Sequence, residues 1–126
     1  MTITTALDTS VRTVSASDFT GALSLTVGGA GVNVTSGTGA DSITGGAGND
    51  VIITGPGADQ VTATNGGTDS INLGEGADTI AAANLIGATD TVVGGSGSDT
   101  LSYADAADVV STTLTLTSGF DVISLA

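Results

Sequence analysis

The sequence contains no Cys, His, Lys or Trp, and each absence removes a class of chemistry. Without Cys there is no disulfide framework and no reactive thiol. Without His, Cys and Lys, the chain lacks most of the side chains that act as general bases or nucleophiles, so we do not expect an enzyme. Aromatic residues are scarce as well, since only Phe19, Tyr103 and Phe120 occur. Because a compact globule uses more large rings to fill its centre, this composition favours a thin core of aliphatic layers.

Positive charge is also nearly absent. Thirteen acids and the single base Arg12 give the 126-residue chain a net charge of −12. Nucleic acids and anionic lipids are bound through Lys and Arg, so neither is expected as a partner. No apolar stretch approaches the length of a membrane span, so membrane insertion is not expected, and no signal-peptide pattern is present. The partner that such a surface attracts is a cation.

What the sequence does contain is a repeat of acids that follow glycine-rich turns. In "GGAGNDVIITGPGADQV" (45–61), Asp50 and Asp59 stand nine residues apart, and Ile52 and Val61 follow them at the same offset. The same register recurs at Asp41, Asp50, Asp59, Asp69, Asp78, Asp90, Asp99, Asp108 and Asp121. An apolar residue stands two positions after each acid: Ile43, Ile52, Val61, Ile71, Ile80, Val92, Leu101, Val110 and Ile123. Nine of the thirteen acids share this register, which a randomly charged surface would not produce.

Each nine-residue unit predicts a glycine-rich turn followed by a short strand. Glycine allows positive φ and close backbone approach in the turn, and the apolar residue of the strand points inward. So short a strand is stable only when parallel copies stack, and two units would make one coil. The acids would then form two columns, the first with Asp41, Asp59, Asp78, Asp99 and Asp121, and the second with Asn33 (from "GGAGVNVTS"), Asp50, Asp69, Asp90 and Asp108. The sequence therefore predicts an all-β solenoid with two rows of aliphatic core residues.

The best copies of the unit, "GGAGNDVII" (45–53) and "GGSGSDTLS" (94–102), resemble the Gly-Gly-x-Gly-x-Asp-x-U-x nonapeptide of the RTX calcium-binding family, where U is large and apolar. "SGTGADSIT", "TGPGADQVT" and "LGEGADTIA" lack only the first Gly, and the pattern weakens at 85–93, 103–111 and 116–124. The resemblance implies a right-handed parallel β-roll over residues 28–126, with calcium-binding turns in two columns. Residues 1–27 are predicted to be N-terminal solenoid or cap strands that continue into the roll.

Stacked carboxylates need a counter-charge. Neighbouring coils of a solenoid lie about 4.8 Å apart, and carboxylates at that distance repel by roughly 1–3 kcal/mol per neighbour. Summed over two columns, the repulsion rivals the whole stability of a domain, about 5–15 kcal/mol. One Arg cannot offset it, whereas divalent cations between the turns can. Oxygen ligands without His or Cys favour Ca²⁺, because Mg²⁺ requires a smaller and stricter octahedron.

In the RTX family the ion sits between turns on the same side, held by Asp side chains and turn carbonyls. The resemblance therefore implies these pairs of ligands: Asp41 with Asp59, Asp59 with Asp78, Asp78 with Asp99, Asp50 with Asp69, and Asp90 with Asp108. Weaker sites would join Asp99 with Asp121 and Asn33 with Asp50. The turn glycines expected to complete the sites are Gly37, Gly39, Gly46, Gly48, Gly55, Gly57, Gly74, Gly76, Gly95 and Gly97. We expect about four to six bound calcium ions, and we assign Asp8, Asp18, Glu75 and Asp105 to the surface.

Two kinds of secreted bacterial protein could carry such a segment. The first is a surface-layer or extracellular matrix protein, in which calcium orders the fold and the segment self-associates into a lattice or contacts neighbouring solenoid domains of the same chain. The second is an RTX toxin, protease, lipase or adhesin, in which the segment is a calcium-triggered folding and secretion module. Low aromatic content and abundant Thr, Ser and Ala favour the first. Both imply an extracellular location and type I secretion, and the mid-domain character of the residues after Met1 suggests a segment of a longer protein.

Other functions fit the sequence less well. "GGAGND" is not followed by the Lys-Ser/Thr of a phosphate-binding loop. Paired carboxylates could serve a glycosidase, but here they are periodic and assigned to calcium. The residues that precede the acids do not form the flat Thr array that ice binding requires. These observations leave a calcium-binding structural role.

Overall fold

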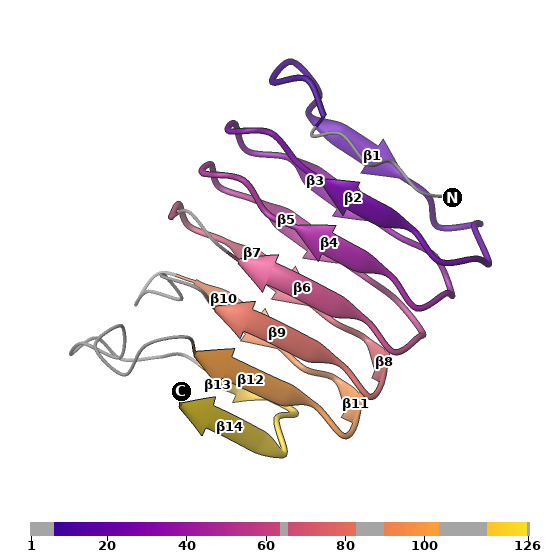
Figure 1. The fold of residues 1–126 in the computed structure, drawn as a ribbon, viewed down its shortest axis with the longest axis vertical. Helices are drawn as coiled ribbons and strands as arrows, with labels where there is room; N and C mark the ends of the chain where they lie inside the picture. Colours follow the sequence, from indigo (N-terminus) through magenta and orange to yellow (C-terminus); the bar gives the residue numbers. More distant parts are fainter. Residues whose placement is uncertain (1–6, 64–65, 83–89, 104–115, 126) are drawn as a thin grey trace.

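The structure is a computed structural model that describes residues 7–63, 66–82, 90–103 and 116–125. All regular structure in these ranges is β, and every strand pair is parallel. Figure 1 shows the strands stacked coil upon coil along one axis, from β1 and β2 at the N-terminal end to β13 and β14 at the C-terminal end. The predicted all-β solenoid is therefore confirmed. No helix in the described ranges is long and apolar enough to cross a membrane.

Two six-stranded sheets form the opposite walls of the solenoid. Sheet A contains, in spatial order, β2 (Ser24–Thr26), β4 (Ser42–Thr44), β6 (Gln60–Ala63), β9 (Thr79–Ala82), β12 (Thr100–Tyr103) and β14 (Val122–Leu125). Sheet B contains β1 (Thr13–Ser15), β3 (Asn33–Thr35), β5 (Val51–Ile53), β7 (Ser70–Asn72), β10 (Thr91–Val93) and β13 (Leu116–Ser118). A small third sheet pairs β8 (Glu75–Gly76) with β11 (Ser96–Gly97) in the turns that lead from sheet B to sheet A. Each coil thus gives one strand to each wall.

The strands stack with a step of one coil, which is two nonapeptide units. In sheet A, Ile43 pairs with Leu25 on one side and with Val61 on the other. Backbone hydrogen bonds join the coils, as where the N–H of Gln60 donates to the carbonyl of Asp41 at 2.8 Å. The extra residues before Asp69 and Asp90 do not shift the strands, because β10 pairs in register with β7.

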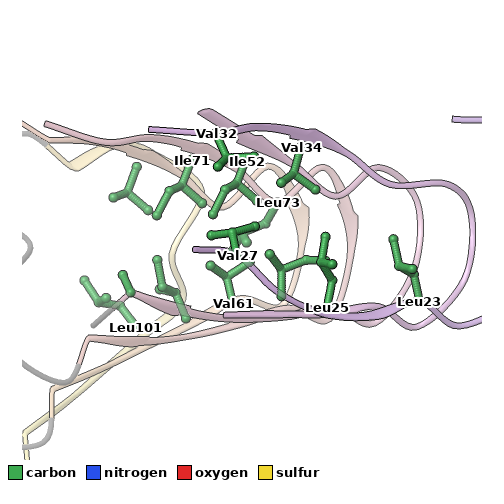
Figure 2. Packing of buried hydrophobic residues seen from close by; sticks show 14 residues of the cluster. Leu23, Leu25, Val27, Val32, Val34, Ile52, Val61, Ile71, Leu73 and Leu101 are labelled. Atoms are coloured by element: carbon green, nitrogen blue, oxygen red, sulfur yellow. The ribbon is translucent and has the colours of Figure 1, made fainter. Parts of the chain in front are cut away.

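The core is a thin layer between the two sheets, and Figure 2 shows its side chains facing one another across that layer. Sheet A contributes Leu25, Ile43, Val61, Ile80 and Leu101, and sheet B contributes Val34, Ile52, Ile71 and Val92, all at most 2% exposed. These side chains point inward because successive residues of a strand face opposite sides. The predicted rows of aliphatic residues are confirmed for these positions. Ile123 pairs with Leu101 through its backbone.

The position predicted for Asn33 is wrong by one residue. Asn33 pairs with Val51, so the residue that meets Asp50 is Val32, whose N–H donates to the Asp50 carboxylate. Asn33 is exposed on the outer face of sheet B, whereas Val32 and Val34 are buried. The reason is the two-residue alternation of a strand: aligning Asn33 with Asp50 would turn both valines toward solvent.

The strand next to β10 also differs from the expectation. The repeat spacing predicts that the unit of Asp108 and Val110 stacks on the unit of Val92, but β10 pairs with β13 instead, with Leu116 opposite Val92 and a register shift at this step. The segment "LTLTS" around Leu116 alternates apolar and polar residues, so it offers a strand that competes for this edge. Asp108 and Val110 themselves lie outside the described residues.

Residues 7–27 form the N-terminal end of the same solenoid, with β1 in sheet B and β2 in sheet A. β1 and β2 pair in parallel with β3 and β4, and the N–H of Leu7 donates to the carbonyl of Thr26 at 2.9 Å. "DFTGALSLT" (18–26) takes the place of a nonapeptide, with Leu23 at the position that Asp41 has in the next coil. An alignment on the acids cannot detect this unit, because it has an apolar residue in their place.

Candidate metal centres

The acids of the first column lie in line along sheet A, each one residue before a strand. Their carboxylates accept hydrogen bonds from the backbone N–H of the acid one coil earlier. The bonds run from Asp41 to Asp59 Oδ1 (2.8 Å), from Asp59 to Asp78 Oδ1 (2.8 Å), from Asp78 to Asp99 Oδ1 (3.0 Å) and from Asp99 to Asp121 Oδ2 (3.1 Å). At the start of the column, Asp41 Oδ1 accepts from the N–H of Leu23 at 2.8 Å. The structure thus brings the five acids of this column together in the expected order.

The second oxygen of four of these carboxylates is buried without a hydrogen-bond partner in the described part of the chain. Asp41, Asp59, Asp78 and Asp99 are at most 2% exposed, and the atom in question is Oδ2 of each. An ionised carboxylate loses its hydration in such a place, and burying a charge without compensation is among the most costly arrangements in a protein. Each Oδ2 therefore needs a proton or a cation.

Burial raises the pKa of acids in both columns. The pKa of Asp78 is raised to about 6, chiefly by desolvation and further by the charges of Asp59 and Asp99, although the N–H of Asp59 opposes the shift. The pKa of Asp69 is likewise raised to about 6, chiefly by desolvation, with the N–H of Asp50 opposing and neighbouring acids adding to it. A raised pKa means that the charged form is poorly accommodated, and a cation beside the carboxylate reverses that preference.

The glycines of the turns before the first-column acids stack in two ranks. One rank is Gly37, Gly55, Gly74 and Gly95, and the other is Gly39, Gly57, Gly76 and Gly97. A Cβ on Gly57 would collide with the carbonyl oxygen of Gly39 and lie 2.9 Å from Oδ1 of Asp59. A Cβ on Gly76 would meet the carbonyl of Gly57 and lie 3.2 Å from Oδ1 of Asp78. Glycine at these positions therefore lets the turns stack so closely that a carbonyl of one turn lies near the carboxylate of the next.

The second column is less regular than the first. Oδ1 of Asp50 accepts from the N–H of Val32 (2.9 Å), Oδ1 of Asp69 from Asp50 (2.8 Å) and Oδ1 of Asp90 from Asp69 (2.7 Å). Asp50 differs from the first-column acids because its Oδ2 also accepts a hydrogen bond, from the N–H of Gly46 at 3.0 Å. Asp69 is only half-buried. Of the other predicted ligands, Gly46 and Gly48 stack on Gly28 and Gly31, and Asp108 lies outside the described residues.

Thr54 is a residue of the first column that the repeat alignment does not point to. It occupies the first position of "TGPGADQVT", where the best copies have Gly, and it is fully buried. Its hydroxyl donates to the carbonyl of Leu73 at 2.5 Å, and Ser36 donates in the same way to the carbonyl of Thr54 at 2.8 Å. Burial raises the pKa of Asp59, and the hydrogen bond from the N–H of Asp41 opposes this shift only in part. The sequence signal that could have identified Thr54 is a hydroxyl residue at the first position of the unit, where the best copies have Gly.

The oxygen donors of the first column fit a hard divalent cation. In the ranges that the structure describes, no three acidic side chains come close enough to hold an ion by themselves. A bound ion therefore needs backbone carbonyls as well, and the glycine ranks place carbonyls beside the carboxylates. Carboxylate and carbonyl oxygens are the ligands that Ca²⁺ prefers. Together with the unpartnered Oδ2 atoms, these donors fit calcium between successive turns.

Comparison with known families decides what this repeat is. The family model of the RTX calcium-binding nonapeptide repeat (4 copies) matches residues 27–61, 63–80 and 87–110, which is more than half of the chain. The chain belongs to the RTX calcium-binding repeat family. Among curated proteins and solved structures, no match was found.

The RTX ranges contain every described acid of the two columns except Asp121. RTX repeats bind calcium and occur in proteins that bacteria secrete, and the RTX β-roll is a structural repeat. The expectation of calcium as the ligand is thus supported by the family and by the donor set together.

Proposed function

We propose that this RTX segment is a calcium-binding structural repeat of a secreted bacterial surface-layer or extracellular matrix protein, and that it folds when calcium binds. The observation that carries the proposal is the row of buried Oδ2 atoms at Asp41, Asp59, Asp78 and Asp99, which accept no hydrogen bond in the described residues. Bound calcium supplies the positive charge that these oxygens lack. The chain cannot supply it, because Arg12 is its only base.

The residues of each turn have separate roles in this proposal. The N–H of Asp41 holds Oδ1 of Asp59, which orients the carboxylate and leaves Oδ2 for an ion. Gly57 allows its turn to approach the turn of Gly39 closely, so that the carbonyl of Gly39 lies near the carboxylate of Asp59. The same arrangement recurs around Asp78 and Asp99. We propose sites of the second column at Asp50, Asp69 and Asp90. About four to six ions would then be bound.

Calcium binding and folding are coupled because the sites exist only where successive coils stack. A strand of three residues has no stability of its own and depends on its neighbours for its edges. Without calcium, the carboxylates of adjacent coils repel and oppose that stacking. A ligand that binds only the folded state stabilises it by mass action, so the calcium-free chain should lack most of its β structure.

Circular dichroism during a calcium titration of metal-stripped protein tests this proposal. A β spectrum should develop with Ca²⁺ and not with Mg²⁺ at the same concentration. Asp59→Asn should shift the midpoint to higher calcium. Glu75→Gln removes the same charge from an exposed position outside the columns and should leave the midpoint unchanged. A full β spectrum at neutral pH in excess chelator and low salt would rule the coupling out, and equal midpoint shifts for the two variants would rule out the columns as sites.

The alternative is that the segment belongs to a toxin, protease, lipase or adhesin, in which it is a calcium-triggered folding and secretion module. We favour the surface-layer or matrix setting because aromatic residues are scarce and Thr, Ser and Ala are abundant. In both settings we propose an extracellular, non-catalytic role and export by a type I route. Sedimentation velocity separates the two: calcium-dependent self-association supports the lattice, whereas a monomer at every calcium concentration favours the module.

A further inference from the structure

Residues 7–36 contain β1 and the first coil, which consists of β2 and β3, and they differ from the later coils in what they place at the acid positions. Leu23 and Val32 stand where the next coil has Asp41 and Asp50, and they are only 3% and 2% exposed. Phe19 takes the place of a turn glycine and packs against the core. The coil therefore has apolar side chains where the later coils carry charge.

The second coil adds only one acid to each column. Oδ1 of Asp41 accepts from the N–H of Leu23 at 2.8 Å, and Oδ1 of Asp50 accepts from the N–H of Val32 at 2.9 Å. Neither donor residue carries a charge, so the first two coils contain no pair of stacked carboxylates. Repulsion between neighbouring coils begins only with the third coil, where Asp59 stacks on Asp41.

Within the residues that the structure describes, the first coil also buries more apolar side chains than any coil that follows. Leu23, Leu25 and Val27 all point into the core from its sheet A segment, with at most 4% exposure. In the next coil, two of the three equivalent positions are Asp41 and Gly45. Apolar burial is the main favourable contribution to folding, and it does not depend on metal.

We propose that residues 7–54 form a calcium-independent folding seed, onto which the acid-bearing coils stack toward the C-terminus as calcium binds. This inference rests on the proposed coupling of calcium binding to folding in the later coils. A short strand needs an existing edge to pair with, and β4 and β5 of the seed present that edge to β6 and β7. Folding of this RTX segment is then directional, because only its N-terminal end forms without ions.

Hydrogen exchange of the full chain, read by mass spectrometry in excess chelator and in saturating calcium, tests the seed. In chelator, the amides of Leu23, Val27 and Ser36 should exchange at least about tenfold more slowly than those of β9 and β12. In calcium, all of these amides should be protected. Uniformly fast exchange in chelator with protection in calcium would overturn the seed and leave the proposed function standing. Uniformly slow exchange in both conditions would overturn both.

A matched pair of substitutions separates charge from general disruption. Val32→Asp stacks a second carboxylate on Asp50 inside the seed, so protection of the seed in chelator should fall by about tenfold and return with calcium. Asn33→Asp adds the same charge at the adjacent, exposed position and should change protection little. Should Val32→Asp not fold even with calcium, Val34→Ala weakens only apolar packing, and it should reduce protection of the seed in chelator while β9 and β12 stay protected in calcium. Equal effects of the two Asp variants, or an unchanged seed in Val34→Ala, would overturn the inference.

Discussion

Asp59 accepts a 2.8 Å hydrogen bond on Oδ1 from the backbone N–H of Asp41, one coil earlier, while its Oδ2 is buried without a partner in the described residues. One oxygen of the carboxylate thus joins two coils, and the other is left for a ligand. The same relationship links Asp78 with Asp59 and Asp99 with Asp78. Along this column, a single side chain therefore joins two coils through one oxygen and presents a second, unpartnered oxygen.

An interior acid should matter more for calcium stoichiometry than a terminal one. Asp59 lies between Asp41 and Asp78 in its column, so Asp59→Ala removes a ligand from two neighbouring sites and should lose more than one ion. Asp121 is exposed at the last described step of the column, so Asp121→Ala should change the count little. Calcium bound per chain, measured by equilibrium dialysis, compares the two variants. Equal losses would show that the assignment of the column to calcium sites is wrong.

Acid should replace part of the effect of calcium. The pKa values of Asp69 and Asp78 are raised from 3.8 to about 6 in the folded chain. A raised folded-state pKa stabilises the fold fully below the unfolded value, and this stabilisation is lost as the pH rises through the folded value. Metal-stripped protein should therefore show more β structure at a pH of about 4 than at a pH of about 7.5.

Circular dichroism in metal-free buffer, without a chelator whose affinity changes with pH, measures this difference. The matched variant is Asp78→Asn, which is neutral at every pH and should make the metal-free chain less sensitive to pH. A loss of β structure on acidification over this range would contradict the expectation.

Alanine at a turn glycine should destabilise the solenoid where the turns approach most closely. Gly76 has φ of 148°, and a Cβ there would collide with the carbonyl of Gly57. Gly76→Ala should lower the free energy of unfolding of the calcium-loaded protein by about 1–3 kcal/mol or more, since backbone strain adds to the clash. Gly29→Ala is the control, because a Cβ on Gly29 would meet no atom within 4 Å. Urea unfolding measures both, and similar losses would show that close approach is not what the turn requires.

Each buried aliphatic residue of the solenoid should contribute to the free energy of unfolding as much as a core residue of a globular domain does. Ile80 is fully buried, so Ile80→Ala should lower the free energy of unfolding in calcium by about 2–5 kcal/mol. Val51 lies on the outer face of sheet B with 39% exposure. Val51→Ala should change the free energy of unfolding by no more than about 0.5 kcal/mol. Thermal unfolding at fixed calcium compares the two. A small effect at Ile80 would mean that calcium, rather than apolar packing, dominates the stability of the coils.

Calcium affinity should be that of an extracellular module, with dissociation constants in the range of about 10⁻⁴–10⁻³ M. At such affinity, and with folding coupled to calcium as proposed, the acid-bearing coils would stay unfolded where free calcium is scarce and would fold only at the higher calcium concentration outside a cell. The charge of −12 keeps the calcium-free chain soluble and extended in the meantime. Isothermal titration calorimetry at physiological ionic strength measures the constants. Sub-micromolar affinity at every site would remove the link to secretion and leave the calcium-binding solenoid intact.

The sequence by itself determined the architecture, because both requirements of a coil are local. An acid after a glycine turn and an apolar residue two positions later, as at Asp59 and Val61, specify a turn and an inward-pointing strand residue within one unit. Repetition of that unit then predicts parallel stacking, two columns and a thin core. The kind of ligand follows from the same residues, since acids without bases or soft ligands attract a hard cation.

Tertiary structure alone decided which residues fill each position where the repeat is imperfect. Val32, and not Asn33, meets Asp50 because burying Val32 and Val34 determines the strand register. Leu116 takes the place beside Val92 because the alternating segment around it can form a strand at that edge. The division of each carboxylate into a bonded oxygen and an unpartnered one depends on an N–H donor from the preceding coil, as Asp41 provides for Asp59. Such contacts arise only when the coils stack, so no pattern within a single unit specifies them.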